Sequence, residues 1–267
     1  MGPFELADLV GIDVGLEVAK SFSELSFGEP RWKPSPLQAR MVAAGRLGRK
    51  TGRGWYEYGE DAHRATDPDP IEPADDAPPV RLVGAPAELR ERATNLGLTI
   101  DAPGGAVLVS CRTASLAAQC GDADACGIMI GPPLAVATIA EATRLPSTSD
   151  ATCQAAEGFF AALGLRTEWV GDAPGLVLRR IVCQVVNEAA FAVGEGVGSP
   201  EDVDAGMTLG LNHPRGPFEW AEVIGTANVL ETIDGLWHER REERYRAAPL
   251  LRRAVALGVS LRAASPF

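Results

Sequence analysis

Between residues 80 and 170, short apolar runs alternate with stretches of helical periodicity. Strands are predicted in VRLVG, LTID, AVLVSC, GIMIG and TEWVG, and helices in PAELRERATNLG and from about Ser147 to Leu163. Strands that alternate with helices are typical of an α/β domain. We therefore expect an α/β domain over residues 80–170.

The two ends of the chain show helical periodicity instead. Residues 1–60 end in a glycine-rich basic loop and a short aromatic strand, with the sequence GRLGRKTGRGWYEY. Residues 171–267 begin with a long apolar-periodic helix, VLRRIVCQVVNEAAFAVGEG, and then show a second helix start. There Ser199 can act as the N-cap, Pro200 fits the first helical position, and Asp202 can complete a capping box.

The segment 61–79 separates the first helical region from the α/β region. It contains five prolines and six acidic residues and almost no apolar side chain, so it cannot bury enough surface to fold alone. We expect an acidic, proline-rich linker there. The predicted domains are therefore 1–60, 80–170 and 171–267.

An internal repeat relates the two helical regions. GPFELADLVG at 2–11 matches GPFEWAEVIG at 216–225, and SPLQARMVAAG at 35–45 matches APLLRRAVALG at 248–258. Helical residues 172–215 precede the second copy, whereas only Met1 precedes the first. We expect the first copy to lack a leading helix and to expose the apolar face of LADLVGIDVGLEVA, unless an upstream segment or the second copy covers it.

Composition excludes several classes of protein. The chain has 36 acidic and 25 basic residues and a net charge of −11, which argues against binding to nucleic acid or to an anionic membrane. No apolar run approaches the roughly 18 residues of a membrane helix, so we expect a cytoplasmic protein. Five cysteines without CxxC spacing and three histidines predict reduced packing thiols and no metal site.

Several longer stretches closely resemble the C-terminal helical domain of 3-hydroxyacyl-CoA dehydrogenases. They are GPFELADLVGIDV, PSPLQARMVAAGRLGRKTGRGWYEYG, DAPGLVLRRIVCQVVNEAAFAVGEG and SPEDVDAGMTLGLNHPRGPFEWAEVIG. The resemblance implies a mixed, mainly α fold, in which two helical units flank a degenerate, shortened Rossmann-like α/β domain. The chain resembles the C-terminal half of a tandem member of this family and starts inside the first helical domain.

The resemblance also implies an activity. Members are NAD-dependent oxidoreductases that interconvert L-3-hydroxyacyl-CoA, of the 3-hydroxybutyryl-CoA type, and 3-oxoacyl-CoA in fatty-acid or aromatic-acid breakdown. NAD would bind to an upstream domain, and no cofactor is expected for this chain alone. The implied partners are the acyl-CoA substrate, the upstream dinucleotide-binding domain or a partner dehydrogenase subunit, and a second copy in a homodimer, with no nucleic acid and no membrane.

Four positions of the family's catalytic motifs can be located in this sequence. EATRLPSTS places Glu141 at the catalytic Glu position, and the family's His position falls twelve residues earlier, on Met129. RTASL places Ala114 at the catalytic Ser position, with Ser115 beside it, and PGLVLRR places Arg179 at the catalytic Asn position. Glu141 is thus the one catalytic candidate, and the alternative is an ordinary carboxylate at a helix end.

The nucleotide-binding turn also departs from the family pattern. A dinucleotide fold needs a glycine-rich turn at a helix N-terminus, but in VGAPAEL only Gly84 is kept, and Pro86 and Ala87 stand at the later glycine positions. Asp101 could mimic the acid that binds the ribose, but not without that turn. We expect no cofactor-binding and no metal-binding residues.

Two groups of cations allow more than one interpretation. Arg46, Arg49, Lys50 and Arg53 could attract the phosphates of coenzyme A, or they could belong to tight turns that anchor Trp55, Tyr56 and Tyr58 on the helical core. Arg179 and Arg180 could contact a phosphate or a carboxylate.

Two functional hypotheses follow. In the first, the chain is the C-terminal part of a 3-hydroxyacyl-CoA dehydrogenase, supplies helical packing and part of the substrate wall, and lacks its own catalytic His, Ser and Asn. In the second, it is a noncatalytic assembly module that binds a partner dehydrogenase subunit. Oxidation of hydroxyacyl-CoA by this chain alone would need a base that the sequence does not supply.

Overall fold

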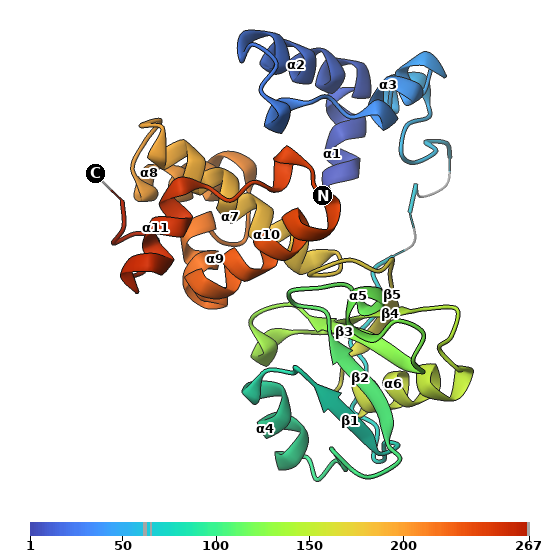
Figure 1. Cartoon of the computed structure of the whole chain (residues 1–267). Coiled ribbons are helices and arrows are strands. Elements are labelled where there is room, and N and C mark those ends of the chain that lie inside the picture. Colours follow the sequence, from blue (N-terminus) through green and yellow to red (C-terminus); the bar gives the residue numbers. More distant parts are fainter. Residues whose placement is uncertain (61–62, 65, 266–267) are drawn as a thin grey trace. The chain divides into compact units, whose positions relative to one another are not determined.

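The computed structural model describes residues 1–60, 63–64 and 66–265 (Figure 1). The chain divides into two compact units, Met1–Asp69 and Pro70–Phe267. The predicted domain boundaries at 60, 79 and 170 stay predictions.

The first unit is helical. Its helices are α1 (Pro3–Val10), α2 (Ile12–Leu25) and α3 (Pro36–Ala43), with 3-10 turns at Pro30–Trp32 and Arg49–Thr51. The carboxylate of Glu5 accepts a hydrogen bond from the backbone N–H of Gly2 at 2.8 Å and so caps α1. Gly11, with φ of 107°, makes the sharp turn from α1 into α2.

The buried carboxylate of Asp8 on α1 binds the aromatic segment that follows the basic loop. It accepts hydrogen bonds from the backbone N–H groups of Trp55 (2.9 Å) and Tyr56 (3.0 Å) and from the hydroxyl of Tyr58 (2.9 Å). A Cβ at Gly54 would overlap this carboxylate, and one at Gly48 would overlap the backbone of Asp8. The aromatic segment therefore lies directly against α1, as the packing interpretation of the basic loop requires.

The cations of the basic loop have partners within the unit. Lys50 pairs with Asp13 at 2.6 Å, Arg53 pairs with Glu57 at 3.0 Å, and Arg46 donates to the carbonyl of Gly54 at 2.7 Å. The guanidinium of Arg49 lies 5.3 Å from the ring centre of Tyr58. These contacts favour the packing interpretation over coenzyme A binding.

The second unit contains a five-stranded sheet. Its strands are β1 (Val80–Val83), β2 (Ala106–Ser110), β3 (Ala125–Ile130), β4 (Ile139–Arg144) and β5 (Arg166–Trp169), in the order β1-β2-β3-β4-β5. All neighbours are parallel except β3 and β4, which are antiparallel. Three helices accompany the sheet, α4 (Ala87–Asn95), α5 (Leu116–Cys120) and α6 (Asp150–Ala162), and a 3-10 turn spans Leu134–Val136 (Figure 1). The mixed α/β class predicted from the sequence is confirmed.

Two hydrophobic clusters cover this sheet. In one cluster, Leu89 of α4 and Phe159 and Phe160 of α6 pack with Val80 and Leu108 of the sheet. In the other, Leu116 at the start of α5 packs with Val109, Ala125, Met129 and Leu176. Successive residues of one strand enter different clusters, as Leu108 and Val109 of β2 do, because side chains alternate between the two faces of a sheet.

Two details of the predicted sheet were wrong. LTID forms no strand, because Asp101 adopts a φ of 56° and only Ile100 makes an isolated bridge, to Val80. The additional strand β4 was not predicted, since its sequence IAEATR has few strand-forming residues. Its backbone instead gains pairing from both sides, with β3 and β5.

The rest of the second unit is a helical bundle. Its helices are α7 (Leu178–Gly194), α8 (Pro200–Ala205), α9 (Pro217–Ile224), α10 (Thr226–Arg240) and α11 (Pro249–Leu257), with a π-helical turn at Gly206–Gly210 and a 3-10 turn at Glu243–Tyr245. The capping box of Ser199 and Asp202 is present as predicted. Helix α7 packs against α9, α10 and α11, around buried residues such as Cys183, Phe218 and Ile233.

The two copies of the sequence repeat form helices in the same order. The first copy contains α1, α2 and α3, and the second copy contains α9, α10 and α11, with similar flanking sequences. Both α1 and α9 follow a glycine N-cap with a capping glutamate, and both end at a glycine with positive φ, Gly11 and Gly225. Helices α3 and α11 both begin with proline. No helix like α7 lies against α1 and α2 within the described part of the first unit.

The five cysteines are free, and four of them are buried. Burial raises the pKa of the Cys111 thiol to about 12, so this thiol is not nucleophilic at neutral pH. Among the described residues there is no group of three His, Cys, Asp or Glu side chains that could hold a metal ion. Within the same residues no helix has the length and apolar character needed to cross a bilayer.

The Asp8 contacts generate a first prediction. Replacing Asp8→Ala leaves two backbone N–H groups and one hydroxyl without their acceptor, so we expect the first unit to lose about 2–4 kcal/mol of stability. Hydrogen exchange followed by mass spectrometry should show faster exchange in peptides covering residues 47–58, with residues 70–265 unchanged. The exposed substitution Glu17→Gln is the control, and equal protection in both variants would refute this role of Asp8.

Candidate functional site

A cleft of about 340 Å³ opens between the carboxyl ends of β1, β2 and β3 and the helices α7, α9 and α10. Its sheet side includes Pro86, Ser110 and Met129, and its helical side includes Arg179 and Ile224. In open α/β sheets ligands bind outside the carboxyl ends of the strands. This cleft is therefore the candidate site.

The structure brings two of the four catalytic-motif positions directly together. Met129 on β3 and Glu141 on β4 are opposite partners in the antiparallel ladder. Met129 is 7% exposed and packs with Val109 and Leu176. A thioether has no basic site for a proton, so the strand pair that the motifs indicate carries no acid–base pair.

The carboxylate of Glu141 caps a helix. Its carboxylate accepts hydrogen bonds from the backbone N–H groups of Val177 (3.1 Å) and Leu178 (2.9 Å), at the N-terminus of α7. Burial raises the pKa of Glu141 above its ordinary value, while these two bonds and the nearby charge of Arg180 act to lower it. Glu141 itself lies on β4, but its carboxylate lies at a helix end, where it caps the N-terminus of α7.

The loop after β2 carries the third position. Ala114 does not line the cleft, and its carbonyl accepts a hydrogen bond from Gln119 at 3.0 Å. The hydroxyl of Ser115 accepts from the backbone N–H of Ala118 at 3.2 Å and caps α5. Neither residue directs a hydroxyl at a ligand in the cleft.

The fourth position, Arg179, lines the cleft from α7. Its Nε donates to the hydroxyl of Thr232 at 3.0 Å, and a terminal nitrogen donates to the carbonyl of Asn228 at 3.2 Å. The residue is 6% exposed, and its burial lowers the pKa of the guanidinium from its ordinary value. The position that the resemblance predicted to be the family's Asn thus carries a buried cation.

Two further residues of the cleft were missed by sequence reasoning, Ser110 and Arg112. Both lie at or just beyond the carboxyl end of β2, and both line the cleft. Arg112 pairs with Glu231 of α10 at 3.3 Å. Their position at a strand end was the signal that could have identified them.

The turn after β1 does not fit a dinucleotide. Gly84 has a φ of 65°, but Pro86 is the N-cap of α4 and has no N–H to offer a phosphate. Glu88 places a carboxylate in the first turn of α4, which repels a pyrophosphate. Asp101 is bound to Arg90 and to the backbone N–H of Leu82, so it holds β1 and is not free for a ribose.

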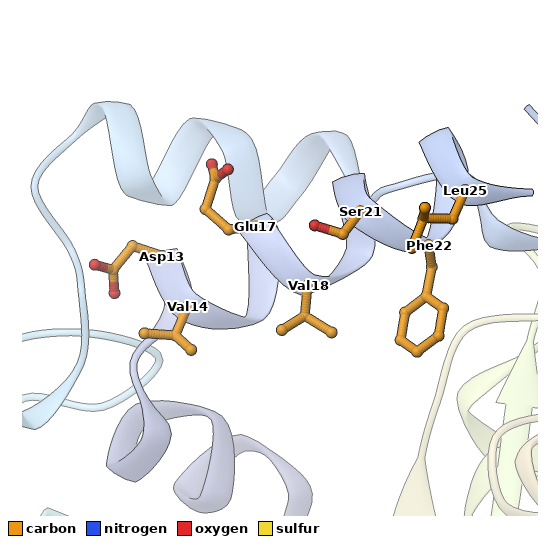
Figure 2. Close-up of a pocket in the computed structure, with 7 residues that line it drawn as sticks. All are labelled: Asp13, Val14, Glu17, Val18, Ser21, Phe22 and Leu25. Atoms are coloured by element: carbon orange, nitrogen blue, oxygen red, sulfur yellow. The ribbon is translucent and has the colours of Figure 1, made fainter.

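A second surface lies in the first unit, along α2. A groove of about 490 Å³ is lined by Asp13, Val14, Glu17, Val18, Ser21, Phe22 and Leu25. Figure 2 shows that the side chains of Val14, Val18 and Phe22 point to the same side of the helix. These three residues are 44%, 49% and 53% exposed, so the first unit itself does not cover this apolar face.

The equivalent positions of the second helical region are buried. Phe218 of α9 and Leu236 of α10 are fully buried in the cluster that includes α7, whereas Phe4 and Phe22 at the matching positions are about half exposed. The exposed face of α1 and α2 thus corresponds to the face that α7 covers in α9 and α10.

The chain matches known proteins over most of its length. The profile of the 3-hydroxyacyl-CoA dehydrogenase C-terminal domain matches residues 1–58 and 175–265. The 3-hydroxyadipyl-CoA dehydrogenase of Escherichia coli K12 is 31% identical over 265 residues, which are 96% of this chain and 51% of that protein. The 3-hydroxybutyryl-CoA dehydrogenase of Bradyrhizobium diazoefficiens is 36% identical over 132 residues, which are 49% of this chain and 45% of that protein.

Solved structures agree with these sequence matches. A crystal structure of 3-hydroxybutyryl-CoA dehydrogenase from E. coli K12 matches with a TM-score of 0.77 and 27% identity, over 96% of this chain and 51% of that one. The (S)-3-hydroxybutyryl-CoA dehydrogenase of Ralstonia eutropha matches with a TM-score of 0.54 and 29% identity, over 82% and 77%. The chain spans about half the length of the curated relatives it matches first. It belongs to the 3-hydroxyacyl-CoA dehydrogenase family.

Proposed function

We propose that this chain is a noncatalytic half of an NAD-dependent 3-hydroxyacyl-CoA dehydrogenase. In this proposal, hydride transfer takes place on a nucleotide-binding domain outside residues 1–267. The observation that carries it is Met129, which faces Glu141 across the β3–β4 ladder where the reaction needs a histidine. The chain contributes helical packing and part of a substrate wall.

The reaction sets demands that the cleft does not meet. Oxidation of a 3-hydroxyl needs a base for the hydroxyl proton and a nicotinamide that accepts the hydride. Met129 cannot accept a proton, Glu141 is engaged by two backbone N–H groups, and Arg179 stays protonated. The turn with Pro86 and Glu88 does not fit NAD.

The substrate class of the whole enzyme follows from its relatives. Relatives matched at 31% and 36% identity are named for 3-hydroxyadipyl-CoA and 3-hydroxybutyryl-CoA, which are short-chain 3-hydroxyacyl thioesters. We propose a short 3-hydroxyacyl-CoA as the substrate, and fatty-acid or aromatic-acid breakdown as the context.

The open face of α1 and α2 indicates how the chain joins the catalytic part. Because α7 covers the matching face in the second helical region, we propose that an α7-like amphipathic helix covers the first. That helix belongs to the catalytic domain, either within one longer chain or in a partner dehydrogenase subunit. The second arrangement is the assembly-module hypothesis, and the same open face supports it.

The absence of a base and of a nucleotide turn predicts that the chain alone is inactive. With NADH and acetoacetyl-CoA, we expect no loss of NADH absorbance above the uncatalysed rate, at least ~10⁴-fold below a complete enzyme. The R. eutropha relative is the positive control. Turnover by the purified chain would overturn the proposal.

We propose that Glu141 is a structural cap and not a catalytic group. Replacing Glu141→Ala leaves two N–H groups of α7 unpaired, so the second unit should lose about 1–3 kcal/mol of stability. Urea denaturation followed by circular dichroism measures this loss, with Gln154→Ala on the exposed face of α6 as the control.

The pH dependence of stability gives a second readout of Glu141. Its folded pKa is raised above the ordinary 4.5, so its contribution is fully present below that value and decreases as the pH rises toward the raised pKa. Glu141→Gln should remove this part of the pH dependence. An unchanged pH profile in the Gln variant, together with full stability in the Ala variant, would argue against a capping role.

The proposed docking face can be tested with a charged substitution. Val18→Asp places a carboxylate in the centre of the apolar groove, so we expect at least a ~10-fold weaker complex. The partner is the half of the E. coli 3-hydroxyadipyl-CoA dehydrogenase that this chain does not match, and binding is measured by fluorescence anisotropy. Glu24→Gln, an exposed residue of α2 outside the groove lining, is the control, and equal affinity for both variants would place the interface elsewhere.

A further inference from the structure

Arg179 is hydrogen-bonded to no carboxylate among the described residues. Both groups that accept its hydrogen bonds, the hydroxyl of Thr232 and the carbonyl of Asn228, are neutral. Among the described residues no carboxylate lies within ion-pair distance of it. Buried charges in proteins are normally paired, because removing an ion from water is costly. Arg179 is 6% exposed and faces the cleft, so an anion there would supply the missing partner.

The charged groups around Arg179 also favour the binding of an anion. Arg112 lines the same cleft, and its positive charge adds to the lowering of the pKa of Arg179. Glu231 of α10 acts to raise the pKa of Arg179, but its carboxylate pairs with Arg112. The acid of the lining, Glu88, is exposed, so water screens its charge.

A hydroxyl and an apolar wall complete the environment. The hydroxyl of Ser110 has no hydrogen-bond partner among the described residues, although the residue is 8% exposed and lines the cleft. The remaining walls are largely apolar, formed by side chains such as Leu89, Ile128, Leu134, Val223 and Ile224. A ligand that fits therefore has one anionic end and a hydrocarbon body.

Size and charge favour a carboxylate over a phosphate. A volume of about 340 Å³ lies at the lower end of the range for small-molecule pockets and is small for coenzyme A or a dinucleotide. The start of α4 offers Pro86 and Glu88 where a phosphate would need N–H donors. A guanidinium binds either anion, so the volume and the start of α4 decide between them.

We propose that this cleft binds a small carboxylic acid with a short hydrocarbon chain, and that Arg179 holds its carboxylate with help from Arg112 and Ser110. This goes beyond the proposed function, because it assigns a ligand to a cleft without catalytic groups. The carboxylate can belong to a free short-chain acid or to the distal end of an acyl chain on coenzyme A, and the test separates these two sources.

The test measures binding of hexanoate to the full chain by saturation-transfer NMR and calorimetry. We expect saturable binding of hexanoate, at least ~10-fold weaker binding of the neutral analogue hexanol, and no competition by inorganic phosphate. Arg179→Met should weaken hexanoate binding at least ~10-fold, whereas Arg180→Met on the same helix should not. A 6-carboxyhexanoyl thioester of coenzyme A that binds more tightly than hexanoate would identify the acyl-chain end as the source, and the reverse order a free acid.

A second readout does not depend on the ligand. Removing an unpaired buried charge relieves its desolvation cost, so Arg179→Met without ligand should have a higher melting temperature than the wild type, and hexanoate should stabilise only the wild type. If Arg179→Met does not fold, Ser110→Ala should still weaken hexanoate binding. No binding of hexanoate, equal binding of hexanol, or binding unaffected by both substitutions would overturn the proposal.

Discussion

The second unit depends on a close approach between α10 and the loop that follows β2. A Cβ at Gly235 would overlap the carbonyl oxygen of Thr113, so only glycine allows this contact. On the same face of α10, one turn before and one turn after, Glu231 pairs with Arg112 and Glu239 accepts from the backbone N–H of Ser115 at 2.8 Å. The sheet and the bundle are therefore held at one edge, and the cleft lies beside that contact.

A second set of contacts joins the sheet to the start of α7. The carboxylate of Glu141 reaches from β4 to the first N–H groups of α7, and the backbone N–H of Gly175 donates to the carbonyl of Cys111 at 2.6 Å. Met129 and Glu141, which the resemblance placed at catalytic-motif positions, thus serve packing and capping. The interactions that shape the cleft are separate from those that the proposed reaction would need.

The sequence predicted the strands β1, β2, β3 and β5 and the helices α4 and α6, since their patterns are local and strong. It did not predict β4, because that strand is defined by backbone pairing with β3 and β5 and not by its own side chains. The motif spacing located Met129 and Glu141, but only the antiparallel register shows that they face each other. Ser110 and Arg112 were not identified from the sequence, because it is their position at the carboxyl end of β2 that places them in the cleft.

The two helical regions show that the burial of a side chain depends on the neighbouring helices as well as on the local sequence. Phe4 and Phe218 stand in nearly identical sequences, yet one is half exposed and the other has no exposed surface. The difference is α7, which packs on α9 and has no counterpart in the first unit's described residues. In that unit the buried carboxylate of Asp8 and the aromatic segment after it hold α1 in place. Polar contacts can thus keep a helical unit ordered while its apolar face stays open for a partner helix.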